Sequence, residues 1–271
     1  MRKIINFSFV IFFLIALNNI SYGQKETLTL ADSLLTQKNF IEAIKNYQLI
    51  IKQSPNYEPA WFGLQTAYIQ SGNFSSGQNI KNIFSSDRLL WGQIRILFYS
   101  NKFDSVPVYM VELVRRFPNS AFVNNALELG ILQTELGDDT INLKKYAMAQ
   151  FNYETQNYTE GINAVQEIIV KSGTIAEYGY LLLSRLFSAK KEFNQAIATL
   201  NEFTMKFPSG KFIAKARYEL GLIYLESVKD TMMAKNVFED LISNYPASPE
   251  SYFARSKITI LGEIKSKEVP K

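Results

Sequence analysis

One spacing of large and small residues recurs along the chain. An aromatic residue is followed three positions later by a small or compact residue, and seven and ten positions later by bulky residues. At about 100° per residue, these positions share one face of a helix. The copies are Phe40/Ala43/Tyr47/Ile50, Phe103/Val106/Met110/Leu113, Tyr158/Gly161/Val165/Ile168, Phe193/Ala196/Leu200/Phe203 and, with threonine first, Thr231/Ala234/Phe238/Leu241. The spacing therefore predicts one amphipathic helix for each copy.

The copies recur at a distance typical of stacked helical hairpins. A weaker copy, Phe74/Gly77/Phe84, has Lys81 where a bulky residue is expected. With it included, the first positions lie 34, 29, 55, 35 and 38 residues apart. Repeats of this length are single supersecondary units that bury their apolar faces only by stacking. We therefore expect an all-α fold of stacked helix hairpins.

Helix breaks fall where such a repeat requires them. Pro55, Pro118, Pro208 and Pro246 each lie fifteen residues beyond the first position of a copy. Proline cannot continue a helix, so it directs the chain into the next unit. Short polar segments precede the copies, as expected of turns inside hairpins. Before Thr231 one extra residue enlarges this turn, and Gly221 is expected to allow close approach of the adjacent helix.

The segments before the copies carry a second pattern. Trp61, Leu64 and Tyr68 precede Phe74, and Leu220-Gly221 precedes Thr231. Together with the copies, this pattern resembles the tetratricopeptide repeat, or TPR, over most of 24–257. The segments 117–120 and 244–248 are similar to the TPR subtype of bacterial envelope proteins, such as the lipoprotein subunit of the outer-membrane β-barrel assembly machine and the periplasmic cell-division coordinator. This resemblance implies a right-handed α-solenoid that serves as an envelope adaptor.

The spacing also divides the chain. We expect N-terminal TPR units over 24–119, an extra helix and possible bend over 120–139, and C-terminal units over 140–249. The extra helix accounts for the 55-residue gap between Phe103 and Tyr158. A capping helix and a charged tail should occupy 250–271. The glycines between Ser71 and Gly92 indicate the most loosely packed stretch.

Residues 1–23 have the composition of an export signal. Arg2 and Lys3 precede an apolar run from Ile4 to Leu17, and small residues lie before Gln24, where we expect cleavage. The alternative is an uncleaved anchor, but the run is shorter than the roughly 20 residues that span a bilayer. Since the chain has no cysteine, it lacks the residue that a bacterial lipid anchor needs. These features predict a periplasmic protein with no membrane segment after cleavage and no lipid anchor.

Composition excludes most catalytic and cofactor chemistry. The chain contains no histidine and no cysteine, which excludes nucleophile–histidine pairs and most transition-metal sites. Carboxylates alone can act on glycosidic bonds, so Asp138-Asp139 and Glu58 are candidates, but adjacent aspartates point apart and this pair fits a solvated turn better than a catalytic site. Without Arg2 and Lys3, the 29 basic residues become 27 against 25 acidic ones, too balanced for nucleic-acid binding. We expect no enzyme activity, no cofactor and no metal.

The remaining aromatic and polar residues of the first helices are candidates for a partner-binding groove. In the TPR family the first helices line the concave surface, so the resemblance implies a groove that binds a protein or peptide. Aromatic residues and arginine are enriched at binding hot spots. The candidates are Phe62, Trp91, Arg95, Phe98, Tyr99, Tyr146, Gln150, Tyr153, Tyr178, Arg185 and Tyr218.

Three alternatives stay open at this point. The candidates could simply pack between successive first helices, although Arg95 and Arg185 would then need partners because an unpaired buried charge is costly. Export and abundant tyrosine are also compatible with glycan binding, and a repeat array can associate with another copy of itself. Leu28 and Asp32 occupy first-unit positions where some TPRs carry a lysine/asparagine clamp for a terminal carboxylate, so we do not expect chaperone-tail binding.

Overall fold

The structure, a computed structural model, describes residues 23–78, 80, 86–137, 139–170 and 173–268, with the side chains of 262–268 left out. Nearly all of the predicted export signal and the expected core residue Phe84 lie outside these residues. Within the described part of the chain all regular structure is helical and no strand occurs. The all-α prediction is therefore confirmed.

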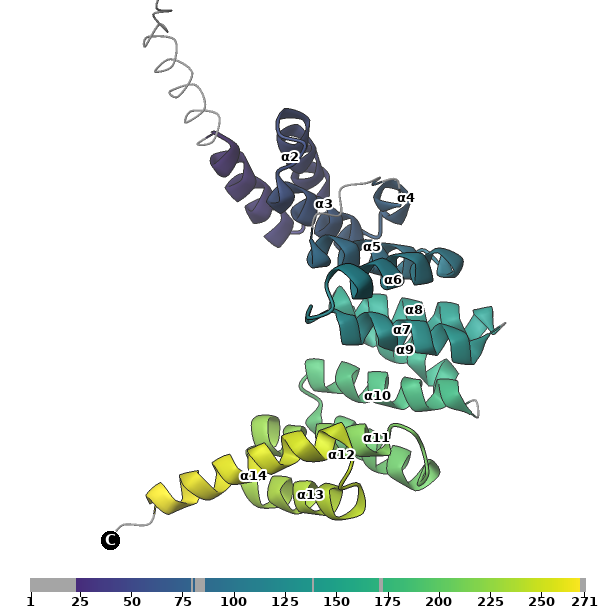
Figure 1. Cartoon of the computed structure of the whole chain (residues 1–271), viewed down its shortest axis with the longest axis vertical. Coiled ribbons are helices and arrows are strands. Elements are labelled where there is room, and N and C mark those ends of the chain that lie inside the picture. Colours follow the sequence, from purple (N-terminus) through teal and green to yellow (C-terminus); the bar gives the residue numbers. More distant parts are fainter. Residues whose placement is uncertain (1–22, 79, 81–85, 138, 171–172, 269–271) are drawn as a thin grey trace, which may run out of the picture. The chain divides into compact units, whose positions relative to one another are not determined.

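Helices follow one another along the described chain (Figure 1). The first covers residues 23–36. The others are α2 (Phe40–Gln53), α3 (Glu58–Ser71), α4 (Phe74–Gly77), α5 (Asp87–Tyr99), the 3-10 turn η1 (Phe103–Ser105), α6 (Val106–Arg116), α7 (Val123–Leu136), α8 (Thr140–Glu154), α9 (Tyr158–Ile169), α10 (Thr174–Ala189), α11 (Phe193–Lys206), α12 (Ile213–Leu222), the π-helical segment η2 (Ile223–Val228), α13 (Thr231–Asn244) and α14 (Pro249–Glu268).

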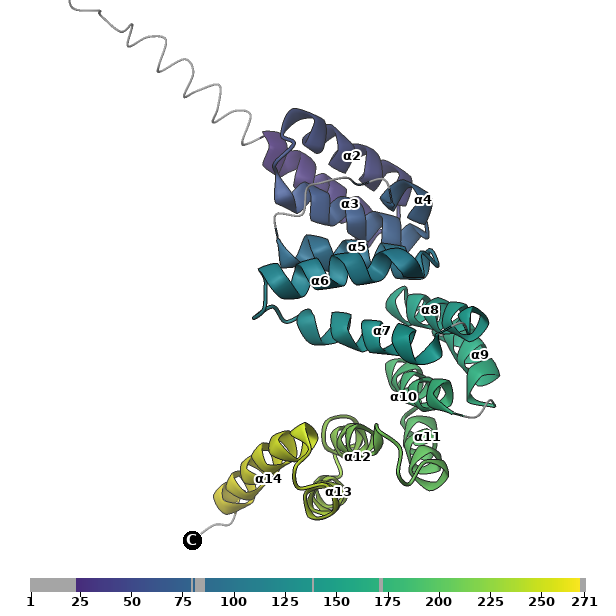
Figure 2. The same cartoon turned by 45° about the vertical axis from the view of Figure 1, so that its right-hand side comes forward.

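The chain forms two compact units, Met1–Gln133 and Thr134–Lys271. The division falls inside α7, which lies where the extra helix is expected. In the first unit the 23–36 helix, α2 and α3 pack in chain order, and α5 pairs with α6. In the second unit α8 to α14 pack each against its neighbours in the chain (Figure 2). Each unit is thus a stack of neighbouring helix pairs.

The recurring spacing marks the buried face of each second helix. In α2, Ala43, Tyr47 and Ile50 have no exposed surface. The same three offsets are fully buried in α11 and α13, at Ala196/Leu200/Phe203 and Ala234/Phe238/Leu241. Each fully buried leucine, isoleucine or phenylalanine of this face contributes about 1.5–3 kcal/mol through the hydrophobic effect. Burial of Tyr47 also raises the pKa of its hydroxyl, which donates a 2.6 Å hydrogen bond to Asp32 Oδ1.

The weak copy at Phe74 forms only one helical turn. α4 ends at Gly77, and α5 packs directly against α3. We expected loose packing as far as Gly92, and this is wrong for the last part of the stretch. Gly92 lies within α5, is buried, and is so close to Gln65 that an added Cβ would lie 2.4 Å from its Oε1.

The turns inside the hairpins share a backbone feature that the polar sequence did not predict. The residue two positions before each copy has a positive φ, at Lys38, Gly72, Asn101, Gln156, Lys191 and Lys229. At Lys191 the N–H bonds to Ser188 O, and the next N–H, of Glu192, bonds to Phe187 O. These two bonds form a Schellman motif, which satisfies the last carbonyls of the preceding helix.

The extra residue before Thr231 is accommodated in the helix. We expected it to enlarge the turn, but Ile223–Val228 forms a π-helical segment, and Lys229 still lies two positions before Thr231. A π-helical turn absorbs one inserted residue without changing the direction of the chain that follows. The positive φ is therefore kept as in the other hairpins, although the N–H groups of Lys229 and Asp230 both bond to the Tyr224 carbonyl in place of the two Schellman bonds.

The prolines end the second helices as predicted. Pro55, Pro118, Pro208 and Pro246 each lie two residues beyond the last residue of α2, α6, α11 or α13. The residue before each proline leaves the helical conformation, with φ between −125° and −139°. This matches the steric exclusion of the helical region before proline.

Glycines permit the closest helix contacts. A Cβ on Gly221 in α12 would lie 2.3 Å from the Phe238 ring of α13, which confirms the expected close approach. Gly63 in α3 and Gly130 in α7 lie equally close to Tyr47 and Met110. The second helices can thus place large side chains directly against a neighbouring backbone.

We expect Gly221→Ala to lower the free energy of unfolding by about 1–3 kcal/mol, because the methyl group would overlap the Phe238 ring. Urea unfolding followed by circular dichroism measures the change. The double variant with Phe238→Leu should lose less than the sum of the single variants. Additive losses would show that the two residues do not interact.

We expect Lys191→Gly to raise the free energy of unfolding by about 0.5–1 kcal/mol, because glycine removes the left-handed strain at φ 64° but has a more flexible unfolded state. Lys190, at φ −74°, is the matched control, and Lys190→Gly should destabilise. Equal effects of both substitutions would contradict the importance of the positive φ.

Candidate partner-binding surface

In the first unit, aromatic rings and arginines alternate along α3 and α5. Arg88 and Arg95 lie seven residues apart on α5, two helical turns, with Trp91 between them. The Arg88 guanidinium lies 4.8 Å from the centre of the Phe62 ring and its Nε is 2.6 Å from Glu58 Oε1. We call Phe62, Arg88, Trp91 and Arg95 the α3–α5 surface. Each of these four residues is partly exposed.

Trp91 is held in place by its neighbours. Its ring stacks on Phe122, with 6.0 Å between centroids and 10° between planes, and the Arg95 guanidinium lies 5.8 Å from its centre. Cation–π contacts of this kind contribute about 0.5–1 kcal/mol at exposed sites. The indole is therefore ordered before any partner binds.

Two other candidates of this unit belong to the packing around α5. Phe98 has no exposed surface. Tyr99 is partly exposed, and its ring lies 6.1 Å from that of Phe74 and 6.0 Å from that of Phe98. Because Phe98 is interior, it cannot line the groove, and its inclusion among the candidates is wrong.

In the second unit two predicted groove residues are interior. Tyr146 and Tyr178 are 3% and 2% exposed, and their rings pack edge to face at 5.9 Å. The Tyr178 ring also meets Phe212 at 4.6 Å, and its hydroxyl lies 3.3 Å from Glu135 Oε2. These rings fill the space between first helices, so they are not part of an accessible surface.

Arg185 has a partner that the sequence did not identify. Its Nη2 and Nε lie 2.5 Å and 3.1 Å from Glu219 Oε1, which joins α10 to α12. The side chains keep 33% and 19% of their surface exposed. The charge is therefore paired between adjacent first helices and does not itself indicate binding.

The other three candidates of the second unit reach the surface. Gln150 is partly exposed, and Tyr153 is 38% exposed. Tyr218 is partly exposed and lies 5.8 Å from Phe238 and 6.1 Å from Phe253, measured between ring centroids. Phe253 comes from α14, so its place beside Tyr218 depends on packing of the last helix.

The carboxylates considered for catalysis have structural partners or lie outside the described residues. Glu58 pairs with Arg88, and Asp139 accepts a hydrogen bond from the N–H of Asn142 as the N-cap of α8. Asp138 lies outside the described residues. In the part of the chain that the structure describes, no group of acidic residues could hold a metal ion, and no helix is long and apolar enough to cross a membrane.

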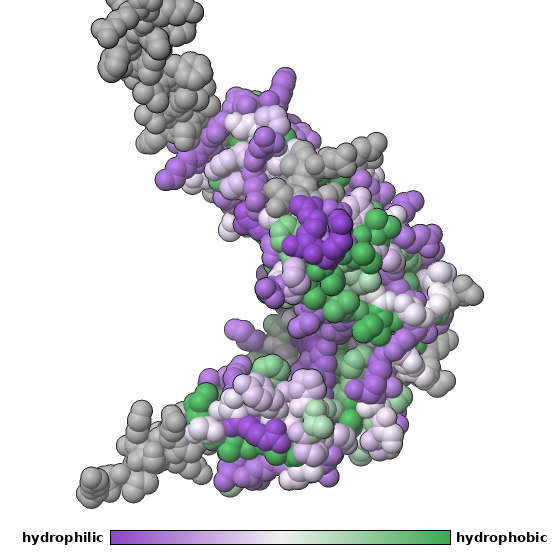
Figure 3. Space-filling model, in the orientation of Figure 1, coloured by the Kyte–Doolittle hydropathy of each residue, from purple (hydrophilic) through white to green (hydrophobic). Residues whose placement is uncertain are grey.

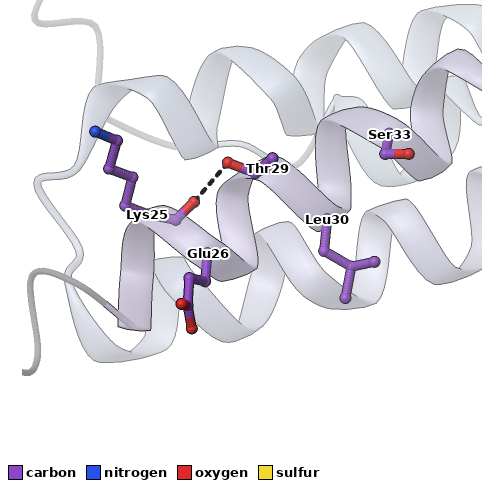
Figure 4. Close-up of a pocket in the computed structure, with 5 residues that line it drawn as sticks. All are labelled: Lys25, Glu26, Thr29, Leu30 and Ser33. Carbon is purple, nitrogen blue, oxygen red and sulfur yellow. Dashed lines mark hydrogen bonds between the residues drawn. The ribbon is translucent and has the colours of Figure 1, made fainter.

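A hollow of about 500 Å³ lies on the 23–36 helix, and no candidate residue lines it (Figure 4). It is lined by Lys25, Glu26, Thr29, Leu30 and Ser33. All five come from one helix, and Thr29 uses its hydroxyl to bond to the Lys25 carbonyl at 2.9 Å. The hollow contains no convergent polar groups from a second element, so it does not qualify as a ligand site.

Comparison with known proteins supports the TPR family. Residues 215–248 match the family model "Tetratricopeptide repeat". This segment contains Gly221, the Thr231 copy and Pro246, which are among the residues on which the resemblance rests. No curated protein matches the chain. Among solved structures it is similar to the TPR domain of P58(IPK), with 14% identity, a TM-score of 0.36, and coverage of 91% of this chain and 67% of that chain.

We expect the Arg185–Glu219 pair to contribute to stability. A double-mutant cycle with Arg185→Met and Glu219→Gln, followed by urea unfolding, should give a coupling energy of about 0.5–1 kcal/mol that decreases in high salt. The exposed pair Lys235–Glu239, 3.5 Å apart on α13, is a control with smaller expected coupling. A coupling energy of zero would show that Glu219 does not stabilise the Arg185 charge, which could then pair with a partner protein.

Proposed function

We propose that this protein is an exported scaffold of the TPR type that binds a protein partner in the bacterial envelope. The stacked helix pairs and the TPR match over 215–248 support an interaction scaffold. Candidate residues that are buried, that pack around α5 or that are paired with Glu219 are left out of the proposed binding site. The α3–α5 surface is the proposed binding site, with Gln150, Tyr153 and Tyr218 as further candidates on the second unit.

The proposal depends chiefly on the ordered aromatic and arginine side chains of the α3–α5 surface. Phe62 and Trp91 present apolar area, and Arg88 and Arg95 supply hydrogen-bond donors beside it. Aromatic residues and arginine are enriched at the centres of interfaces relative to the rest of the protein surface. Because the rings and guanidinium groups already contact one another, little side-chain freedom is lost on binding.

The surface favours a peptide or protein segment over a glycan. Sugars commonly bind by stacking on an open aromatic face, but the Trp91 ring is stacked on Phe122 and has the Arg95 guanidinium near its centre. Tyr99 is likewise in contact with Phe74 and Phe98. An extended or helical segment can instead contact the ring edges and the arginines together.

Export is proposed from the N-terminal sequence alone. The charged start, the apolar run and the small residues before Gln24 support cleavage by a signal peptidase. The mass of the protein purified from its native envelope should correspond to a chain that begins at Gln24. A mass that includes Met1–Gly23 would indicate an uncleaved anchor.

We expect a photo-crosslinking residue in place of Phe62 to form a discrete protein adduct in the native envelope. Because Arg95 and Trp91 belong to the same surface, Arg95→Ala and Trp91→Ala should reduce the adduct at position 62 at least tenfold while leaving helicity unchanged. The matched control is Ile41, which is 70% exposed on the second helix α2.

An adduct of equal intensity at positions 41 and 62 would contradict the proposal. Soluble-glycan binding that disappears in Trp91→Ala and Tyr99→Ala would favour the glycan-binding alternative. Light scattering across a dilution series tests self-association separately.

A further inference from the structure

A second pocket, of about 490 Å³, lies between α2, α3 and α4 in the first unit. Unlike the hollow on the 23–36 helix, it is lined from several elements: α2 supplies Ile51 and Lys52, α3 supplies Trp61 and Leu64, and α4 supplies Ser76. Apolar side chains with a few convergent polar groups are typical of ligand pockets. Figure 3 shows mostly hydrophilic surface around the first helices of this unit, so apolar side chains do not gather there generally.

The pocket lies where the second helix of a hairpin ends early. α4 has four residues, whereas α11 and α13 have fourteen each. Trp61 holds the same repeat position as Tyr180 of α10, since each lies thirteen residues before its copy. Tyr180 is 1% exposed, and its ring lies 6.2 Å from that of Phe203 in α11. Trp61, in contrast, stays partly exposed and lines the pocket.

The rings of the pocket are held in place by hydrogen bonds. Trp61 Nε1–H donates one of 2.7 Å to the Pro55 carbonyl, and the Gln48 amide donates one of 3.1 Å to the Tyr68 hydroxyl. Leu64 and Tyr68 line the pocket although they are only 4% and 5% exposed. Because these side chains are already ordered, little freedom is lost when an apolar group packs against them.

The charge of the pocket lining is positive. Among the described residues that line the pocket, Lys52 is the one charged residue, and it is exposed. Within the described part of the chain, its ammonium group forms no ion pair or hydrogen bond. A ligand that places a carboxylate beside Lys52 and an apolar group against Trp61 would therefore match both the charge and the apolar side chains of the pocket.

We propose that this pocket binds a peptide segment of another protein in which a large apolar side chain lies next to a carboxylate. The apolar side chain packs against Trp61 and Leu64, and the carboxylate pairs with Lys52. A peptide fits better than a sugar, because sugar hydroxyls need convergent acceptors and the lining holds no carboxylate among its described residues. The pocket shares no residue with the α3–α5 surface and does not depend on the function proposed above.

The test uses protein that carries Trp91→Phe, in which Trp61 is the remaining tryptophan. Its fluorescence therefore reports on the pocket, while the α3–α5 surface is altered in the same protein. The probe is a synthetic peptide with blocked ends and a central Leu-Phe-Asp-Asp between glycines and serines. Titration should shift the Trp61 emission to shorter wavelength and saturate, because the apolar side chains of the peptide remove water from the indole.

Two substitutions in α2 locate the binding site. Ile51→Glu places a negative charge in the apolar lining and should weaken binding at least tenfold. Ile41→Glu is the matched control on the same helix, 70% exposed and outside the pocket, and should leave the affinity unchanged. Circular dichroism of each variant verifies folding.

A second comparison tests the pairing with Lys52. A peptide with Leu-Phe-Asn-Asn should bind about two- to fivefold more weakly than the Leu-Phe-Asp-Asp peptide, because it lacks the carboxylates. Protein with the further substitution Lys52→Gln should bind both peptides equally. Since Lys52 is exposed, this variant leaves the core intact.

No saturable binding, equal binding by the Ile51→Glu protein, or equal binding of both peptides by protein that retains Lys52 would overturn the proposal. Binding that appears only after Phe84→Ala would assign the pocket to a side chain of the chain itself. An emission shift caused by decanoate or by an N-acetylglucosamine oligomer, with none from the peptide, would assign it to a lipid or a glycan. None of these outcomes would alter the crosslinking expected at Phe62.

Discussion

Each inner helix of this chain has to bury apolar surface against both the helix before it and the helix after it. A single helix presents more than one apolar face in this arrangement, and its neighbours in the sequence are the elements that cover them. In α12, Ala216 belongs to the core shared with α11, and Ala214 to the core shared with α13 and α14. Stability is therefore distributed along each unit as a series of contacts between adjacent helices.

Small residues determine how closely these helices can approach. Gly63 lies against Tyr47 and Gly221 against Phe238, so a large ring from one helix reaches the backbone of another. The positive φ two residues before each copy then sets where the second helix begins. At Lys229 this geometry persists although one residue has been inserted, because the π-helical segment before it absorbs the insertion. Helix spacing and turn geometry together preserve the stacking.

The candidate surface arises as a by-product of that stacking. α5 packs directly on α3, since the intervening α4 has only one turn. This contact brings Arg88 close to Phe62 and Glu58, which lie about thirty residues earlier in the chain. Because these side chains already contact one another, a partner could bind the proposed site without rearranging them.

The sequence alone determined the helical class, the helix that each copy forms, the ends set by the prolines and the close contact at Gly221. These features depend on residues a few positions apart, or on rules of backbone geometry that hold in any context. The accessible site depended on tertiary structure, because exposure is decided by side chains from other helices. Tyr146 and Tyr178 are buried against each other, and Arg185 is paired with Glu219 from α12. Only helix packing brings Arg88 to Phe62 and Phe122 to Trp91. Contacts between side chains of different helices cannot be predicted from the spacing of residues within one helix.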